Sequence, residues 1–262
     1  MNTKVENSQP IEKENVKEKT FNRKKKIKSE IVSFSLIIFF VLLFRSMFFE
    51  PFKIPSGSMI PTLMIGDFIL VNKFSYGFKV PFSEWFTDPV YITEPSHPKR
   101  GDVIVFKYPK NTSLNYIKRV VGLPGDTVEI IDKVVYVNDK PIQAIEIDGS
   151  EIMADMDDKF KHFNFKFYKT YTGEHEHIMQ IEKDNYYNAN YYKITVPEDN
   201  FFVLGDNRDF SADSRVWQFV PFRYVKGKAL FVWFSMSIPW PWSEDDQDNF
   251  KFRPWRIGSI IN

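Results

Sequence analysis

The fold is decided by the stretch Tyr-Ile-Lys-Arg-Val-Val, residues 116–121, which sets a lysine among apolar and β-branched neighbours. A short run of this kind is typical of a buried β-strand rather than of a solvated loop. Burial disfavours the charged form of a lysine, so its amine can lose a proton more readily than in water. The stretch therefore predicts a β-strand fold in which Lys118 can act as a base.

Similar short runs lie on both sides of this stretch, at residues 68–71, 102–106, 127–131, 133–137, 201–204 and 229–234. Turn-forming pairs such as Gly66-Asp67 and Pro124-Gly125 separate them. No convincing helix is indicated between residue 50 and the end of the chain. The fold class is therefore predicted to be mainly β, with an all-β body.

An apolar segment at residues 29–49 is long enough to cross a membrane once. All residues from 31 to 44 except two serines are strongly apolar, and residues 47–49 extend the run to about 20 residues. A cleavable signal peptide usually ends in small residues, whereas this segment ends in Phe48, Phe49 and Glu50. The segment is therefore predicted to be an uncleaved anchor helix.

The charges around the anchor predict its orientation and the domain organisation. Residues 1–28 end in a basic cluster, which predicts a cytoplasmic tail, disordered to about Thr20, and a body on the other side of the membrane. Residues 141–197 are richer in Asp, Glu, Tyr and Asn, and their periodicity is weak. We predict a catalytic β core at 50–140 and 198–262, interrupted by an inserted β subdomain at 141–197.

The composition excludes several classes of function. The net charge of +1 over 262 residues gives no bias towards nucleic acid. The absence of cysteine excludes disulfides, a cysteine nucleophile and thiolate metal sites. An aromatic share of 17%, with 27 Phe, favours a rich core over a lipid-facing surface, and both remain open.

A serine at residue 58 is the candidate nucleophile. A serine hydroxyl needs a neighbouring base to remove its proton, and a neutral Lys118 can be that base. Gly57 permits a tight turn between Ser56 and Ser58, and Pro55 stiffens the approach to it. Ser-Gly-Ser alone is a weak signal, so the hypothesis depends on the pairing with Lys118.

Four segments, in order, resemble bacterial type I signal peptidase, also called leader peptidase: residues 55–63, 99–106, 116–126 and 205–215. The resemblance implies a membrane-anchored endopeptidase with an extracytoplasmic body, which removes signal peptides from exported preproteins without a cofactor. It implies that Ser58 is the nucleophile and Lys118 the general base, that Ser56 helps to hold the oxyanion, and that Ser211 orients Lys118. The second membrane span of many family members is missing, and the insertion is short.

The segment 205–215 carries a dense set of charges, which predicts an internal salt-bridge network around Ser211. The predicted members of this supporting network are Arg119, Asp206, Arg208, Asp213 and Arg215. A substrate bound in an extended conformation presents alternate side chains to the enzyme, which favours small residues at two alternate positions. By resemblance, the walls of the substrate site are Phe52, Ile54, Pro55, Leu63, Ile69, Val105, Tyr116 and Ile117. The implied partners are preproteins, membrane lipid and the secretion translocon, and no nucleic acid.

Other features have simpler interpretations. Arg100-Gly101-Asp102 spells an adhesion tripeptide but is explained by a turn before a strand. His175 and His177 lack a third ligand at a recognised spacing, so we predict a surface loop and no metal. The tryptophans at 233, 240 and 242 fit a core or a membrane interface equally well.

Two other functions are alternatives for this sequence. In the first, the chain is an inert membrane-anchored β scaffold or binding protein. In the second, it is a self-cleaving repressor-type Ser/Lys protease. Proteases of that second class are soluble, so the predicted anchor argues against it.

Overall fold

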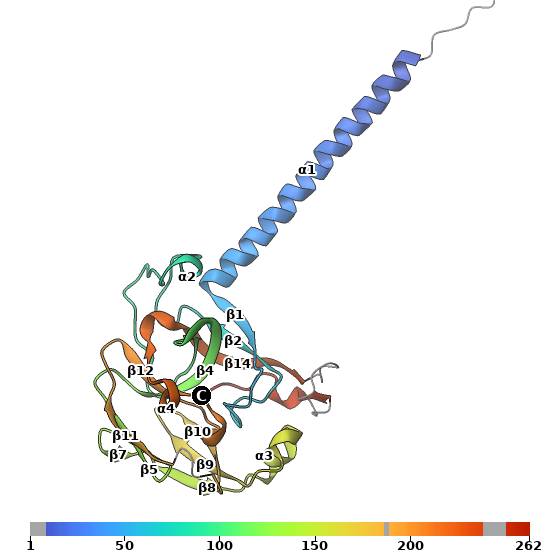
Figure 1. Ribbon diagram of the computed structural model, residues 1–262. Helices are drawn as coiled ribbons and strands as arrows, with labels where there is room; N and C mark the ends of the chain where they lie inside the picture. The colour runs from blue at the N-terminus through green and yellow to red at the C-terminus, as the bar shows by residue number, and fades with distance from the viewer. Residues whose placement is uncertain (1–8, 186–188, 238–249) are drawn as a thin grey trace, which may run out of the picture. The chain divides into compact units, whose positions relative to one another are not determined.

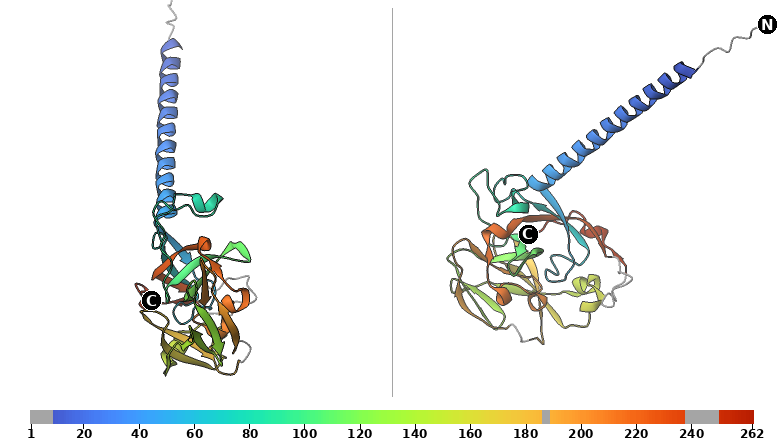
Figure 2. Two further views of the ribbon diagram at one scale, coloured as in Figure 1. Left: turned by 90° about the vertical axis from the view of Figure 1, so that its left-hand side faces the viewer. Right: turned by 45° about the horizontal axis from the view of Figure 1, so that its top comes forward.

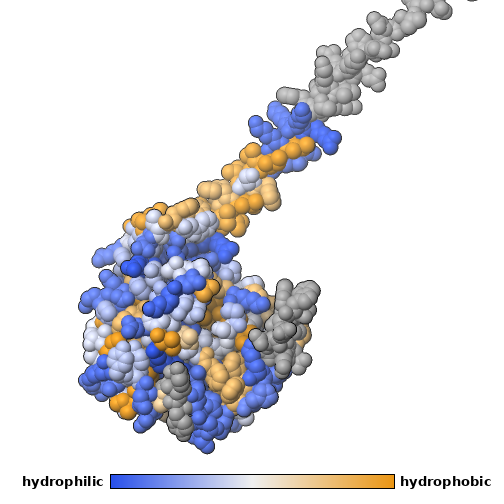
Figure 3. All heavy atoms as spheres, viewed as in Figure 1, coloured by the Kyte–Doolittle hydropathy of each residue, from blue (hydrophilic) through white to orange (hydrophobic). Residues whose placement is uncertain are grey.

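The computed structural model describes residues 9–185, 189–237 and 250–262, and the chain divides into two compact units, Met1–Ser46 and Met47–Asn262. The first unit is formed by the helix α1 (Gln9–Met47), drawn in blue in Figure 1. Its part Arg23–Met47, 25 residues long, is apolar enough to cross a membrane. Figure 3 shows basic side chains at one end of this part and apolar ones along the rest.

The helix begins well before the predicted anchor. We expected disorder up to about Thr20, and this is wrong from Gln9 onward, where the helix is already formed. The stretch is rich in Lys and Glu, which are good helix formers, so its polarity does not prevent a helix. The basic tail and the anchor are therefore one continuous helix in the part of the chain described.

An eight-stranded antiparallel sheet forms the larger part of the second unit (Figure 1). Its strands run in the order β1-β2-β14-β3-β4-β12-β13, and β15 pairs with β14. Their bounds are β1 Phe49–Lys53, β2 Asp67–Asn72, β3 Val103–Tyr108, β4 Asn111–Gly122, β12 Asn200–Leu204, β13 Val220–Pro221, β14 Val225–Ser237 and β15 Lys251–Phe252.

Two smaller sheets complete the body. The first has the order β11-β5-β6-β7 and the second the order β10-β9-β8. Their bounds are β5 Thr127–Ile131, β6 Val134–Val137, β7 Lys140–Pro141, β8 Ala144–Ile147, β9 Phe165–Tyr171, β10 Glu176–Glu182 and β11 Tyr191–Thr195. Each strand predicted from the sequence corresponds to one of these strands, and the mainly β fold class is confirmed.

The connections between strands contain short helices that the sequence did not indicate (Figure 2). Each has six residues or fewer, which is too short to show an amphipathic period. Their bounds are α2 Ser83–Phe86, α3 Ser150–Asp155, η1 Asp158–Phe160, η2 Arg208–Phe210, α4 Ser214–Trp217, η3 Phe222–Tyr224 and η4 Pro254–Arg256.

Residues 141–197 contain the three-stranded sheet, α3 and η1, and also β11. Since β11 pairs with β5, this range shares a sheet with residues assigned to the catalytic core. The division of the body into a core and an inserted subdomain therefore stays a prediction.

The apolar core lies on both faces of β3 and β4. Val103, Val105 and Ile117 belong to one buried cluster, and Ile104 and Val120 belong to another. This division follows from the two-residue period of a strand, which sends successive side chains to opposite faces. Lys118 therefore lies on a strand that is buried on both faces, which is the placement that its sequence neighbours predicted.

Candidate functional site

The side chains of Ser58 and Lys118 meet inside the body. Nζ of Lys118 lies 2.6 Å from Oγ of Ser58 and 2.8 Å from the carbonyl oxygen of Ile117. Ser58 is 8% exposed and Lys118 is 3% exposed. Two residues separated by 60 positions in the sequence thus form one buried pair, at the distance that a direct proton transfer requires.

Burial lowers the pKa of Lys118 from 10.5 to about 8, although the nearby carboxylates of Asp213 and Asp206 act in the opposite direction. At this pKa about a tenth of the amines are neutral at pH 7. The shift corresponds to a net penalty of about 3 kcal/mol on the charged amine in the folded protein. The pair therefore contains both a hydroxyl and a base that is deprotonated in a useful fraction of molecules.

The loop that carries Ser58 is held from both sides. The backbone N–H of Asn207 donates to the carbonyl of Ser58 at 3.2 Å, and Nδ2 of Asn207 donates to the carbonyl of Gly57 at 3.0 Å. A Cβ at Gly57 would lie 2.5 Å from the ring of Phe160, so only glycine fits there. Asn207 was not among the predicted site residues, and its position in the charged segment 205–215 was the only signal for it.

The Arg119–Asp206 pair is the central part of the network behind Lys118. Arg119 donates from Nε and Nη2 to the two carboxylate oxygens of Asp206, at 2.8 and 2.7 Å. The same guanidinium donates from Nη1 to the carbonyls of Gly101 and Asn262. Burial raises the pKa of Asp206, but the charge and hydrogen bonds of Arg119, with His177 and Thr62, together outweigh it and the pKa falls to about 2. The carboxylate is therefore ionised throughout the neutral range.

A second buried pair joins Asp213 to Arg215. Arg215 donates from Nε and Nη2 to the Asp213 carboxylate, at 2.8 Å each, and the backbone N–H of Gly205 donates to it at 3.0 Å. Burial raises the pKa of Asp213, but the charge and hydrogen bonds of Arg215, with those of Gly205 and Ser211, together hold the pKa below its ordinary value. This pair fixes the chain on both sides of Ser211.

The predicted members of the network have different partners. Asp206 pairs with Arg119, and Nε of Arg208 has no partner among the described residues, so the place of Arg208 in the network stays a prediction. Ser211 is buried but does not hydrogen-bond to Lys118, whose Nζ contacts Ser58 and Ile117. A Cβ at Gly205 would lie 2.3 Å from Oγ of Ser211 and 2.4 Å from the carbonyl of Ser58. Ser211 thus lies beside the Ser58 backbone.

Most of the predicted substrate walls lie together. One buried cluster contains Ile54, Leu63, Ile69, Val105 and Ile117, and Phe52 packs against it. Within it, Leu63 and Ile69 are fully buried, so they lie behind the residues that a bound peptide could touch.

Three other predicted residues lie outside this cluster. Tyr116 belongs to the cluster on the other face of the sheet, where its ring stacks on Tyr108 and lies 5.6 Å from Nζ of Lys118. Pro55 and Ser56 are exposed. Both are therefore accessible to a substrate that approaches Ser58.

The predicted surface loop around His177 is a strand. β10 begins at Glu176, and His177 is 6% exposed, with Nε2 3.3 Å from Oγ1 of Thr172. Burial lowers the pKa of His177 to about 4, so its ring is neutral at pH 7. It lies 3.8 Å from Asp206 and thus packs behind the Arg119–Asp206 pair.

By sequence, the tryptophans fit a position in the core and a position at a membrane interface equally well. Trp233 lies on β14, is 43% exposed and packs edge-on against Phe68. Trp240 and Trp242 lie outside the described residues. Trp233 is therefore partly packed in the body and partly exposed, so its position agrees with both interpretations.

Known proteins resemble this chain over most of its length. The family model for signal peptidase, peptidase S26, matches residues 27–234. Signal peptidase I of Rickettsia typhi is 39% identical over 249 residues, which cover 88% of this chain and 90% of that protein. Signal peptidase I of Pseudomonas aeruginosa is 41% identical over 218 residues, 79% of this chain and 72% of that protein. A crystal structure of a signal peptidase I from Enterococcus faecalis is 30% identical, covering 51% of this chain and 97% of that one, with a TM-score of 0.34.

Proposed function

This chain belongs to the signal peptidase family, peptidase S26, and on that premise we propose that it is a membrane-anchored serine endopeptidase that removes signal peptides from exported preproteins. We assign Ser58 as the nucleophile and Lys118 as the general base. The observation that carries this assignment is the buried contact of 2.6 Å between Ser58 Oγ and Lys118 Nζ. No cofactor has a part in the chemistry.

The reaction follows from this geometry. Neutral Lys118 accepts the proton of the Ser58 hydroxyl while Oγ attacks the carbonyl before the scissile bond. The N–H of Ser58 and the hydroxyl of Ser56 donate to the developing oxyanion. Lys118 then gives its proton to the leaving amine. In the second half of the reaction the neutral amine of Lys118 activates a water molecule, which hydrolyses the acyl-enzyme. One base thus serves both halves of the reaction.

The surrounding network supports these roles by fixing positions. Asn207 holds the carbonyls of Gly57 and Ser58, which limits the movement of the nucleophile. The two buried ion pairs, Arg119 with Asp206 and Asp213 with Arg215, place ionised carboxylates near Lys118. Ser211 lies beside the Ser58 backbone, and we assign it the role of orienting the amine of Lys118.

The substrate is proposed to lie extended beside an edge strand. β1 is at the end of the large sheet and leads directly to the loop that contains Ser58. A strand-like substrate would point every second side chain into the wall formed by Phe52, Ile54 and Ile117. Small residues at the position before the scissile bond and two positions earlier fit this wall. They correspond to the A-x-A-like end of a secretory signal peptide.

The chain is anchored in a membrane, and we propose that its N-terminus is cytoplasmic because of the basic residues 23–28. Ser58 follows the end of α1 at Met47 by 11 residues, which span at most about 40 Å. Cleavage therefore takes place near the outer surface of the membrane. The proposed neighbours of the body at this place are membrane lipid and the secretion translocon.

The test is to incubate the purified full chain with a preprotein in detergent and to locate the cut by mass spectrometry. We expect one cut after an A-x-A-like sequence, lost in Ser58→Ala and retained in Ser113→Ala, which changes an exposed serine of β4. A folded protein that leaves every preprotein uncut would favour the alternative of an inert membrane-anchored scaffold.

A further inference from the structure

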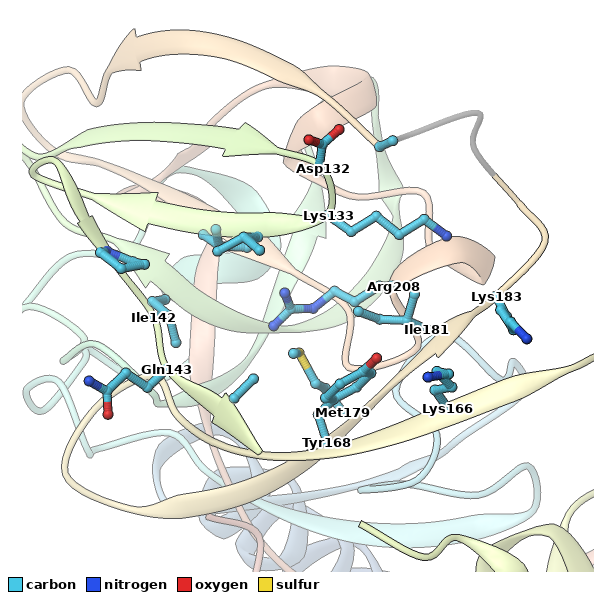
Figure 4. A pocket seen from close by; sticks show the side chains of 15 residues that line it. Asp132, Lys133, Ile142, Gln143, Lys166, Tyr168, Met179, Ile181, Lys183 and Arg208 are labelled. Atoms are coloured by element: carbon cyan, nitrogen blue, oxygen red, sulfur yellow. The ribbon is translucent and has the colours of Figure 1, made fainter. Parts of the chain in front are cut away.

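A cavity of about 660 Å³ lies between the two smaller sheets, away from Ser58 and Lys118. It is bounded by β6 and the β7–β8 connection on one side, by β9 and β10 on the other, and by η2 (Figure 4). Its apolar wall includes Val135, Ile142, Met179 and Ile181. Its size is within the range of about 300–1,000 Å³ that sites for small molecules occupy.

Arg208 is the buried one of the charged residues that line this cavity, and the others are Asp132, Lys133, Lys166 and Lys183. Figure 4 shows its side chain extended across the space, between Lys133 on one side and Met179 and Tyr168 on the other. Arg208 is 5% exposed, its Nε has no hydrogen-bond partner, and no carboxylate within the described residues forms an ion pair with it. Burial lowers its pKa to about 10, so the guanidinium remains charged at neutral pH.

A buried cation without an ion pair is unusual, because its desolvation is only partly compensated. The charges of Asp206 and Asp213 act on Arg208 through space, but these carboxylates pair with Arg119 and Arg215. Lys133 already bonds the carbonyl of Glu182 and pairs with Asp209. Lys183 forms no ion pair within the described residues. The cavity thus combines an apolar wall with two basic side chains that have no ion pair within the described residues, Arg208 and Lys183.

We propose that this cavity binds a carboxylate-bearing amphiphile of the size of a medium-chain fatty acid. The planar guanidinium of Arg208 matches a carboxylate in a two-bond geometry, and the apolar wall accepts the alkyl chain. The site is enclosed by two sheets, so it takes a single molecule rather than a bilayer surface. Lys183 stands at the rim, where it attracts the anion before entry.

The test uses decanoic acid that carries a photoreactive diazirine, with the full chain in nonionic detergent. After illumination, mass spectrometry locates the labelled residues. Labelling of the apolar part of α1 reports how much probe enters the micelle and serves as the internal reference. Relative to that reference, we expect residues 134–144 and 179–183 to be labelled at least tenfold more by the acid than by the matched decanol probe.

Substitutions separate the charge from the shape of the site. Arg208→Gln should lower the labelling about tenfold, and Arg208→Lys should lower it less. Arg223→Gln, at an exposed arginine paired with Asp88, is the matched control and should leave it unchanged. Ala144→Trp, at an exposed position on the cavity wall, should block entry while Arg208 is intact. This variant also tests the site if Arg208→Gln does not fold.

Three results would overturn the proposal. The first is equal labelling by the acid and the alcohol, which would remove the role of the charge. The second is labelling that both Arg208→Gln and Ala144→Trp leave unchanged, which would place the probe elsewhere. The third is labelling by decyl phosphate with none by the acid, which would reject the carboxylate.

Discussion

Replacing Lys118 by methionine should change the pH dependence of stability in a way that reports the state of the buried amine. The folded-state pKa of about 8 is below the ordinary 10.5, so the unfolded chain binds the proton more tightly. Stability of the unsubstituted protein therefore rises with pH between these two values, and the penalty is fully present below pH 8. The penalty is about 3 kcal/mol at pH 7 and about 1 kcal/mol at pH 10.

Methionine removes this penalty and also removes the contact with Ser58, which adds an offset that does not depend on pH. The difference in unfolding free energy between the two proteins should consequently change by about 2 kcal/mol from pH 7 to pH 10. Urea unfolding of the full chain in nonionic detergent, followed by tryptophan fluorescence at several pH values, measures it. Lys110→Met, at an exposed lysine, should give a constant difference. A constant difference for Lys118→Met would refute the depressed pKa.

Three further predictions concern turnover and the nucleophile loop. The kcat/KM of the unsubstituted protein should rise about tenfold between pH 7 and pH 9. Lys118→Arg should be inactive, since a guanidinium stays protonated. Substantial turnover by this variant would reject Lys118 as the base. Ser56→Ala should lower kcat by about 10²–10³-fold with little change in KM if its hydroxyl holds the oxyanion, and near-normal kcat would remove it from the site. Asn207→Ala keeps the backbone bond to Ser58 and loses the side-chain bond to Gly57, so it should cost about 1 kcal/mol of stability and speed amide exchange in the loop of Ser58, whereas unchanged exchange would show that the loop is held by other contacts.

Local sequence patterns were enough to predict most of the strands. Residues 127–131, for example, combine β-branched residues with a Pro-Gly pair before them, and β5 has those bounds. The placement of Lys118 on a buried strand could also be predicted, because its neighbours on both sides are apolar. The pairing with Ser58 could not, since nothing local links two residues 60 positions apart. Only the resemblance to a family brought them together.

The partners of the charged side chains and the strand of His177 could not be predicted, for a common physical reason. Arg119 and Arg208 carry the same charge, and only their positions in space decide that Asp206 pairs with Arg119. His177 lies on a strand in which two consecutive residues are buried. Buried and exposed side chains therefore do not alternate regularly along it, and the segment resembles a loop. A polar side chain of this kind can be assigned a partner only when the packing of the strands around it is known.

The partners of Arg119 also determine when the protein can become active. The guanidinium joins Gly101, Asp206 and Asn262, and the loop of Ser58 depends on Asn207. These contacts close loops of many tens of residues, and contacts of such long range form slowly. A chain that is still being synthesised, or is only partly across the membrane, lacks the later partners. The proposed site is therefore expected to be complete only after these later partners have joined the fold.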